Sequence, residues 1–271
     1  MTLTSSPFDS TRAEARQARV AQRLSRAIAE RGLQVAYQPE VELTTQKLMS
    51  LEALCRWHDE ELDRVTPDEF IAVAEARGLI AALGSEILRM VLADLPALLA
   101  RWPRLRVAIN VSGLELAQPD FAKQFLSTLE RHNSAYPQHL ELEITESIFH
   151  ADPLVVRQNM LTLQAHGITL AIDDFGTGQS SLSRLHTLPF DKIKMDKSFA
   201  QGLANDTGRA ILKAMVDVSA TLNKALVAEG VETPAQQEAL MALGCKQGQG
   251  YLFSPPQPLD GLLASFTMPG L

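Results

Sequence analysis

The chain has 271 residues, 46% of them hydrophobic, and carries a formal net charge of −7. Its length suits one large α/β domain or two smaller ones. The acidic balance, with a pI near 5.4, excludes nonspecific binding to nucleic acid polymers or anionic membranes, because both require a basic field. Cys55 and Cys245 lack the spacing of a zinc ribbon or a disulfide framework. We therefore expect two buried, inert thiols. No apolar run approaches the roughly 18 residues of a membrane-spanning helix, and we expect a cytoplasmic protein.

The N-terminal third predicts a helix, a hairpin and two further helices. Residues 1–10 are predicted to be disordered, and residues 11–31 to form a helix, because apolar side chains recur there at helical spacing. Two apolar runs, 34–41 and 48–57, flank a polar turn and predict a β-hairpin. The Thr66-Pro67-Asp68-Glu69 segment has capping-box spacing and a proline at the first helical position. It therefore predicts a helix start, and a second helix is expected over 85–100.

From residue 106 onward, short apolar runs alternate with helical segments, and each run carries a polar residue near its end. The runs are 106–109, 140–144, 169–172, 190–193, 225–228 and 245–253. Such alternation predicts a parallel sheet. An open doubly wound sheet would bind its ligand at one switch point. Polar residues at nearly every strand end instead favour a (β/α)₈ barrel with its site at that end.

One of these runs ends at Ile172 and leads directly into Asp173, Asp174 and a glycine-rich turn. Neighbouring side chains of a regular strand point to opposite faces, so the two aspartates can converge only where the strand gives way to a loop. The pair is equally compatible with a solvated turn and with a site that faces cations, because unpaired buried carboxylates are costly.

Other strand ends carry polar residues that each have a second interpretation. Asn110 and Ser112 also suit a helix cap, and Glu146 also suits an exposed charge. Lys194 can be a simple salt-bridge partner. Glu229 and Glu232 flank a Gly-Val turn, and Glu232 also suits a helix start, because Thr233-Pro234-Ala235-Gln236 is another capping box. Glu143 is the least ambiguous, because it shares one strand face with Glu141 while leucine and isoleucine occupy the other.

Together these residues predict a metal site, because like charges that converge at one end of a barrel repel unless cations neutralise them. The six histidines are scattered outside the strand-end series, and we do not expect them to be ligands. An all-oxygen set fits Mg²⁺ or Mn²⁺ rather than zinc. The candidate ligands are Glu52, Asn110, Glu143, Asp173 and Asp174.

An ordered set of motifs along this chain resembles the EAL-domain cyclic di-GMP phosphodiesterases. The resemblance runs from about residue 30 to residue 256, so we expect one such domain over residues 11–271. The motifs are Tyr37-Gln38-Pro39, Glu52-Ala53-Leu54 with Arg56-Trp57, Asn110-Val111-Ser112, Glu143-Ile144-Thr145-Glu146, Asp173 through Gly178, Lys194 with Asp196, Glu229-Gly230-Val231-Glu232, and Gln249-Gly250-Tyr251.

The resemblance implies a role for each matching residue. One divalent ion is held by the residues matching Glu52, Asn110, Glu143 and Asp173, and a second by those matching Asp173 and Asp174. Lys194 matches the residue that holds the attacking water, and Glu229 matches a metal ligand or base. The substrate-contacting positions are matched by Gln38, Leu54, Arg56 and Gln249, and the supporting positions by Glu146, Glu232 and Asp196.

The resemblance also implies a modified TIM-type (β/α)₈ barrel with one reversed strand near its start, and a homodimer. The implied reaction is two-metal hydrolysis of cyclic di-GMP to linear pGpG, which lowers this bacterial second messenger. The regulatory partner is not implied. Where catalysis is lost, such a domain acts as a cyclic di-GMP receptor or interaction module. A more distant alternative is a metal-dependent aldolase with Lys194 as a Schiff base.

The chain departs from the family pattern at several positions, and no ligand position is lost. Glu40 stands where an aliphatic residue usually follows Gln-Pro, and Ser50 replaces a common glycine. Ala72 replaces a proline, and Met195 an aliphatic residue. Gln179 stands where an aromatic residue, usually tyrosine, follows the Gly-Thr-Gly turn. Because the family ties that loop to metal binding and dimer contacts, we expect Gln179→Tyr to raise activity or strengthen the dimer.

Overall fold

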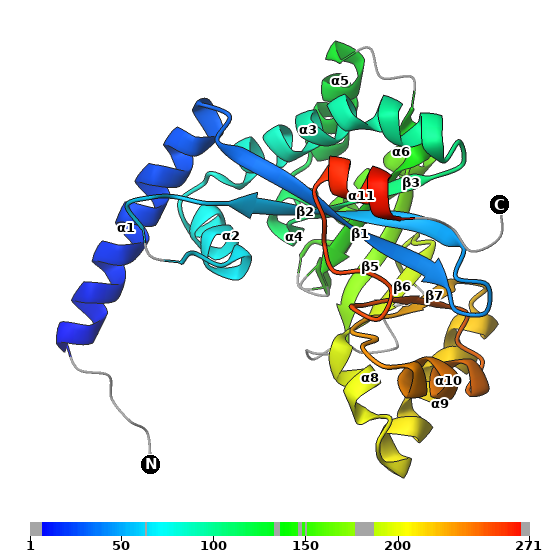
Figure 1. Ribbon diagram of the computed structural model, residues 1–271. Helices are drawn as coiled ribbons and strands as arrows, with labels where there is room; N and C mark the ends of the chain where they lie inside the picture. Colours follow the sequence, from blue (N-terminus) through cyan, green and yellow to red (C-terminus); the bar gives the residue numbers. More distant parts are fainter. Residues whose placement is uncertain are drawn as a thin grey trace. The chain divides into compact units, whose positions relative to one another are not determined.

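The computed structural model describes residues 7–62, 64–132, 136–145, 148–149, 151–176 and 187–266 (Figure 1). The chain divides into two compact units. One consists of Met1–Gln34 with Cys55–Met90, and the other of Val35–Leu54 with Val91–Leu271. Among the described residues, no helix combines the length and the apolar character needed to cross a membrane.

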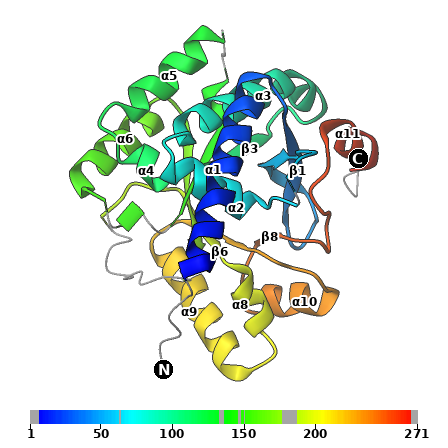
Figure 2. The same ribbon diagram turned by 90° about the vertical axis from the view of Figure 1, so that its left-hand side faces the viewer.

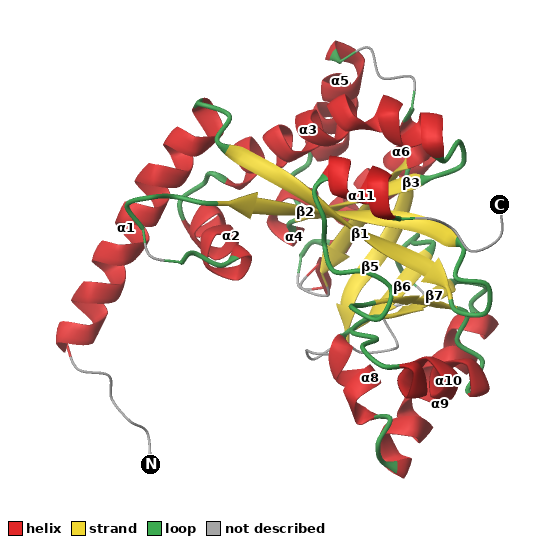
Figure 3. Ribbon diagram, viewed as in Figure 1, coloured by secondary structure: helices red, strands yellow, loops and turns green. Residues whose placement is uncertain are grey.

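The described strands close into a barrel in the order β1 to β8 (Figure 3). Strand β1 runs antiparallel to β8, whereas β2 to β8 pair in parallel. The predicted barrel with one reversed strand near the N-terminus is therefore confirmed, and the open sheet is excluded. The strands are β1 (Leu33–Glu42), β2 (Leu48–Trp57), β3 (Arg106–Val111), β4 (Leu140–Thr145), β5 (Thr169–Phe175), β6 (Lys192–Met195), β7 (Ala225–Ala228) and β8 (Gln247–Gln249).

Helices connect the parallel strands, and most of them begin at a capping residue. Thr66 accepts a hydrogen bond from Glu69 N, as the sequence predicts, and Ser112 and Thr233 each form a complete capping box. The helices are α1 (Pro7–Ala29), α2 (Pro67–Ala76), α3 (Ile80–Arg101), α4 (Gly113–Leu116), α5 (Phe121–Arg131), the 3₁₀ turn η1 (Pro137–His139), α6 (Pro153–Ala165), α8 (Lys197–Gly202), α9 (Asp206–Thr221), α10 (Pro234–Ala242) and α11 (Leu259–Ser265). Figure 2 shows α8, α9 and α10 near one another beyond the barrel strands.

Two predicted boundaries differ markedly from the structure. Helix α1 begins at Pro7, inside the segment expected to be disordered. Strand β8 covers Gln247–Gln249 only, much less than the predicted run over 245–253. Directly after β8 the chain passes close to the backbone of Val231. A Cβ atom at Gly250 would lie 2.1 Å from Val231 O, so this position has no room for a side chain.

The first unit has its own apolar core. Val20 and Leu24 of α1, Trp57 of β2 and Phe70 of α2 are among the buried residues of this cluster. The rings of Trp57 and Phe70 meet edge to face, with centroids 5.9 Å apart, the arrangement that aromatic quadrupoles favour.

The second unit holds the barrel strands from β3 onward, whose two faces differ in polarity. Leu140, Leu142 and Ile144 of β4 are fully buried on one face, and the intervening Glu141 and Glu143 are also buried. Both glutamates form ion pairs with lysines of β6. The acidic face of β4 therefore points into the barrel, whereas the alternation in the sequence left open which of the two faces does so.

We expect Gly250→Ala to destabilise the protein by about 1–3 kcal/mol, because overpacking a close backbone contact costs this much. Gly202→Ala is a matched control, since its added methyl would meet its nearest neighbour at an ordinary 3.7 Å. The free energy of unfolding in urea measures both variants. Equal stability of the two would show that the Val231 contact does not constrain position 250.

Candidate functional site

The ammonium group of Lys194 lies at the centre of four carboxylates inside the barrel. Its Nζ is 2.7 Å from Glu229 Oε1, 2.9 Å from Glu143 Oε1, 3.4 Å from Glu52 Oε2 and 3.5 Å from Asp173 Oδ1. These acids come from β2, β4, β5 and the residue after β7, while Lys194 lies on β6. We call Glu52, Glu143, Asp173, Glu229 and Lys194 the carboxylate cluster. The barrel thus brings together residues spread over 178 positions of sequence.

Amide side chains orient Glu52 within this cluster. Asn110 Nδ2 donates to Glu52 Oε1 at 2.8 Å, and Gln249 Nε2 donates to Glu52 Oε2 at 2.7 Å. Gln249 Nε2 also lies 3.3 Å from Gln38 Oε1, and Gln38 Nε2 donates to Ser254 O. The structure therefore brings the predicted residues Gln38, Asn110 and Gln249 to the acidic site.

Asp173 and Asp174 converge because of a local irregularity in β5. The strand continues to Phe175, so the expectation that it gives way to a loop at the aspartates is wrong. Asp174 instead has a φ of +53°, and the pairing register between β5 and β6 shifts between Ile172 and Phe175. Aspartate tolerates this left-handed conformation better than most residues. The bulge turns both side chains toward one side of the strand.

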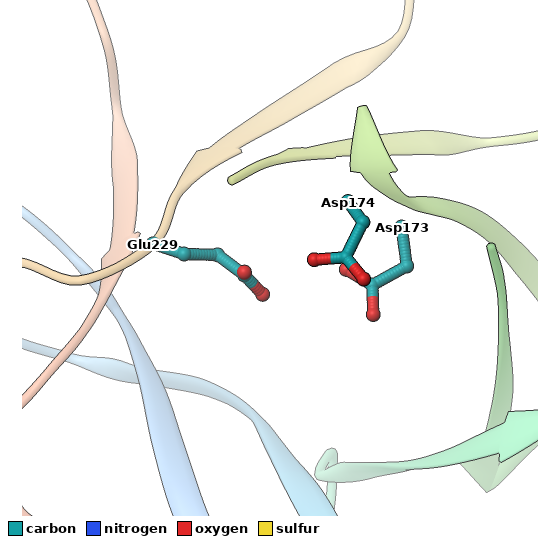
Figure 4. A group of neighbouring side chains, drawn as sticks. All are labelled: Asp173, Asp174 and Glu229. Atoms are coloured by element: carbon teal, nitrogen blue, oxygen red, sulfur yellow. The ribbon is translucent and has the colours of Figure 1, made fainter. Parts of the chain in front are cut away.

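A third acid completes a compact group with this pair. One carboxylate oxygen each from Asp173, Asp174 and Glu229 lie within 4.8 Å of one another. Figure 4 shows the Glu229 carboxyl group pointing toward the two aspartates from the opposite side of the space between them. Asp173 is buried, whereas Asp174 and Glu229 are half-buried.

Burial and mutual repulsion raise the pKa of several of these acids. Burial raises the pKa of Glu143 well above its ordinary value, and Lys194 offsets only part of the rise. Burial also raises the pKa of Glu229 to about 8, and burial together with the charge of Asp173 raises the pKa of Asp174 to about 6. For Glu52, burial acts in the same direction, but the charge of Lys194 and the two amide hydrogen bonds outweigh it and lower the pKa.

Lys194 is held as a cation in this setting. Burial alone would lower the pKa of its ammonium group, but the surrounding carboxylates outweigh this effect and hold the pKa well above its ordinary value. One ammonium group cannot neutralise four ionised carboxylates. The pKa values of Glu143 and Glu229 are therefore raised, and in the absence of a cation bound protons offset part of the negative charge.

The donor atoms fit hard divalent cations. Within the described part of the chain, Glu143 Oε2 is buried with neither a hydrogen bond nor an ion pair, and Glu143 Oε1 and Asp173 Oδ1 are buried with the ammonium of Lys194 as their partner. Buried acceptors in native proteins normally have a hydrogen-bond partner, and such exceptions often mark an ion site. All candidate donors are oxygen atoms, the ligand type that Mg²⁺ and Mn²⁺ prefer.

For the other predicted site residues the structure gives local surroundings and contacts. Leu54 is half-buried near the end of β2, and Arg56 belongs to the first unit, where its Nη1 donates to Cys55 O.

Asp196 caps α8 by accepting a hydrogen bond from Ser198 N. The side chain of Glu232 is exposed, and its backbone N–H donates to Gln236, as expected if it supports a helix start. Glu146 and Gln179 lie outside the described residues.

Sequence reasoning missed a second set of buried charges. Lys192 forms ion pairs with Glu40 and Glu141, and Ser50 donates to Glu40. The period-two alternation of strands contains the signal, because each of these residues lies two positions from a residue already singled out: Gln38, Glu52, Glu143 or Lys194.

The chain resembles known proteins in its family pattern, its sequence and its fold. The family model described as EAL domain matches residues 21–256. An uncharacterized signaling protein of Caulobacter vibrioides is 40% identical over 248 residues, which cover 90% of this chain and 30% of the relative. The bifunctional diguanylate cyclase/cyclic di-GMP phosphodiesterase MucR of Pseudomonas aeruginosa is 39% identical over 247 residues, which cover 89% of this chain and 36% of MucR.

A solved structure described as the PaMucR phosphodiesterase in complex with c-di-GMP superimposes with a TM-score of 0.83 at 37% identity, covering 90% of this chain and 99% of that one. The EAL enzyme Bd1971 in its cAMP-bound form gives a TM-score of 0.85 at 28% identity and covers 94% and 72% of the two chains. The chain spans about a third of the length of the curated relatives named above. Its match over most of its length, its barrel and its acidic site together show that this chain belongs to the EAL domain family.

Proposed function

We propose that this protein is a metal-dependent phosphodiesterase that hydrolyses cyclic di-GMP to linear pGpG. The observation that carries this proposal is the excess of buried carboxylates around Lys194, with oxygen atoms that lack hydrogen bonds in the described structure. Relatives named as cyclic di-GMP phosphodiesterases support the choice of substrate. The proposed ligands for two ions, Mg²⁺ or Mn²⁺, are Glu52, Asn110, Glu143, Asp173, Asp174 and Glu229.

The residues of the carboxylate cluster suit an in-line attack of water on a phosphodiester. Divalent cations held there would supply Lewis-acid polarisation of the phosphate and would acidify water. The ammonium of Lys194 donates hydrogen bonds, so it can hold the oxygen of the attacking water. The Glu229 carboxylate lies 2.7 Å from that ammonium, so it is placed to accept the proton of a water held there. The new P–O bond forms as the ester bond to the leaving 3′ oxygen breaks, and that oxygen takes up a proton from solvent to become the 3′ hydroxyl of the linear product.

Amide groups beside the cluster are suited to orient the dinucleotide. Gln249 and Gln38 form a chain of hydrogen bonds to Glu52, and Gln249 Oε1 is buried without a hydrogen bond among the described residues. We assign substrate contacts to Gln38 and Gln249 on this basis, and to Leu54 and Arg56 on the resemblance alone.

A homodimer, a cytoplasmic location and a single domain over 11–271 remain predictions, as do the roles of Glu146, Asp196, Glu232 and Gln179.

Incubation of the purified protein with cyclic di-GMP and Mg²⁺ or Mn²⁺, followed by chromatography, tests the proposal. We expect linear product that disappears when a chelator is added.

Lys194→Ala and Glu52→Ala should each lower turnover by about 100-fold or more, because each removes a charged group from the reacting centre. Lys246→Ala, at an exposed lysine, serves as the control. Tight binding of the dinucleotide without product would instead identify a receptor.

The raised pKa values predict that the metal-free protein loses stability as pH rises. Between 4.5, the ordinary value for glutamate, and about 8, folded Glu229 binds a proton that the unfolded chain has released. The free energy of unfolding therefore falls with increasing pH across this window. Asp174 acts in the same direction up to about pH 6. Lys194, with its raised pKa, contributes constantly over this range.

Urea denaturation in the presence of EDTA, from about pH 5 to about pH 8.5, measures this slope. Mn²⁺ favours the ionised carboxylates, so the stabilisation that it gives should grow with pH. Glu229→Gln removes the titrating group and should flatten the metal-free profile. Stability of the metal-free protein that rises with pH over this range would contradict the assignment.

A further inference from the structure

A second buried charged network lies inside the barrel, and the proposed reaction does not use it. The Nζ atom of Lys192 is 2.8 Å from Glu40 Oε2 and 2.8 Å from Glu141 Oε1. Ser50 Oγ donates to Glu40 Oε2 at 2.7 Å and lies 3.5 Å from the same ammonium. We call Glu40, Ser50, Glu141 and Lys192 the lower network. All four residues are less than a tenth exposed.

The lower network contains two of the positions at which this chain departs from its family pattern. An aliphatic side chain at position 40 would offer Lys192 no acceptor, and a glycine at position 50 would offer Glu40 no donor. The two departures are in direct contact with each other. Glu40 and Ser50 therefore form one unit whose joint effect is to hold the ammonium of Lys192.

The lower network lies one layer away from the carboxylate cluster. Lys192, Glu141 and Ser50 precede Lys194, Glu143 and Glu52 by two residues each, so the members of each pair face the barrel interior together. Side chains two residues apart in a strand are separated by about 7 Å. The flexible four-carbon side chain of Lys192 can bridge much of this distance. Without Glu40, the ammonium group of Lys192 would keep Glu141 as a partner and would have Glu143 within reach as a second carboxylate.

Glu143 is the natural target for such a shift. Its Oε2 is buried without a hydrogen bond among the described residues, and its Oε1 is already 2.9 Å from Lys194. A second ammonium group bound there would occupy the acceptor that a cation needs and would cancel part of the negative charge of the cluster.

We propose that Glu40 and Ser50 are positioning residues for cation binding: they retain the ammonium of Lys192 in the lower network and so leave Glu143 available to a divalent cation. The inference rests on the proposed function only insofar as the carboxylate cluster takes up such an ion. Groups behind metal ligands typically change metal affinity by about 10–100-fold when they are removed.

Calorimetric titration of the chelator-treated protein with Mn²⁺, without any dinucleotide, tests this inference. We expect Glu40→Gln to weaken Mn²⁺ binding by about 10-fold, and Ser50→Ala to weaken it in the same direction although it changes no charge. Glu42→Gln is the matched control, because it makes the same substitution on β1 at a half-buried residue that bonds to Thr45. Its affinity should equal that of the wild type.

A second experiment separates positioning from loss of fold. The double variant Glu40→Gln/Lys192→Met removes both the anchor and the competing ammonium group, so it should recover the wild-type affinity. A crystal structure of Glu40→Gln should show Lys192 Nζ displaced toward Glu143. If Glu40→Gln does not fold, Ser50→Ala decides the question by the same titration.

Wild-type affinity in both single variants, or an unmoved Lys192 in the Glu40→Gln structure, would overturn the positioning role and leave the proposed hydrolysis intact. A wild-type protein that binds Mn²⁺ but leaves cyclic di-GMP unchanged would refute hydrolysis, whereas the affinity of Glu40→Gln would still decide the positioning role. Absence of Mn²⁺ binding by the wild type would overturn both.

Discussion

The interaction on which the site depends is the contact between one buried ammonium group and four carboxylates. Isolated charges are costly to bury, and a buried ion pair that loses one partner is strongly destabilised. Lys194 therefore requires its acids, and the acids require more positive charge than Lys194 supplies. This imbalance leaves the barrel interior lined with buried oxygen atoms of the kind that hard cations prefer.

Because the barrel is closed, inward-facing side chains at alternate strand positions form layers inside it. Strands β4 and β6 each carry two charged side chains, two residues apart, that face inward, so each strand contributes one residue to the carboxylate cluster and one to the lower network. The intervening residues of β4 are fully buried apolar side chains. The same period that provides the hydrophobic packing therefore stacks two charged layers, separated by about 7 Å along each strand.

Local backbone features adapt this regular scaffold to the site. The left-handed conformation of Asp174 and the register shift in β5 bring adjacent acids to one side, which a regular strand forbids. Gly250 allows the chain to turn against the backbone of Val231 directly after Gln249. Both features lie beside site residues, where departures from regular strand geometry concentrate in proteins.

The sequence by itself predicted the barrel and singled out the acids, because hydrophobic periodicity and polar strand ends are local properties that follow from side-chain direction. The reversed first strand was implied by the resemblance to the EAL domains. The sequence also marked Glu40 and Ser50 as unusual, without indicating that they touch. Only the tertiary structure decided that these two residues share Lys192, that the bulge at Asp174 unites the aspartates, and that Asp196 caps a helix. Such contacts depend on strand register and on distances across the barrel, and the Glu40–Lys192 contact joins residues 152 positions apart, a separation over which no local pattern in the sequence can specify a pairing.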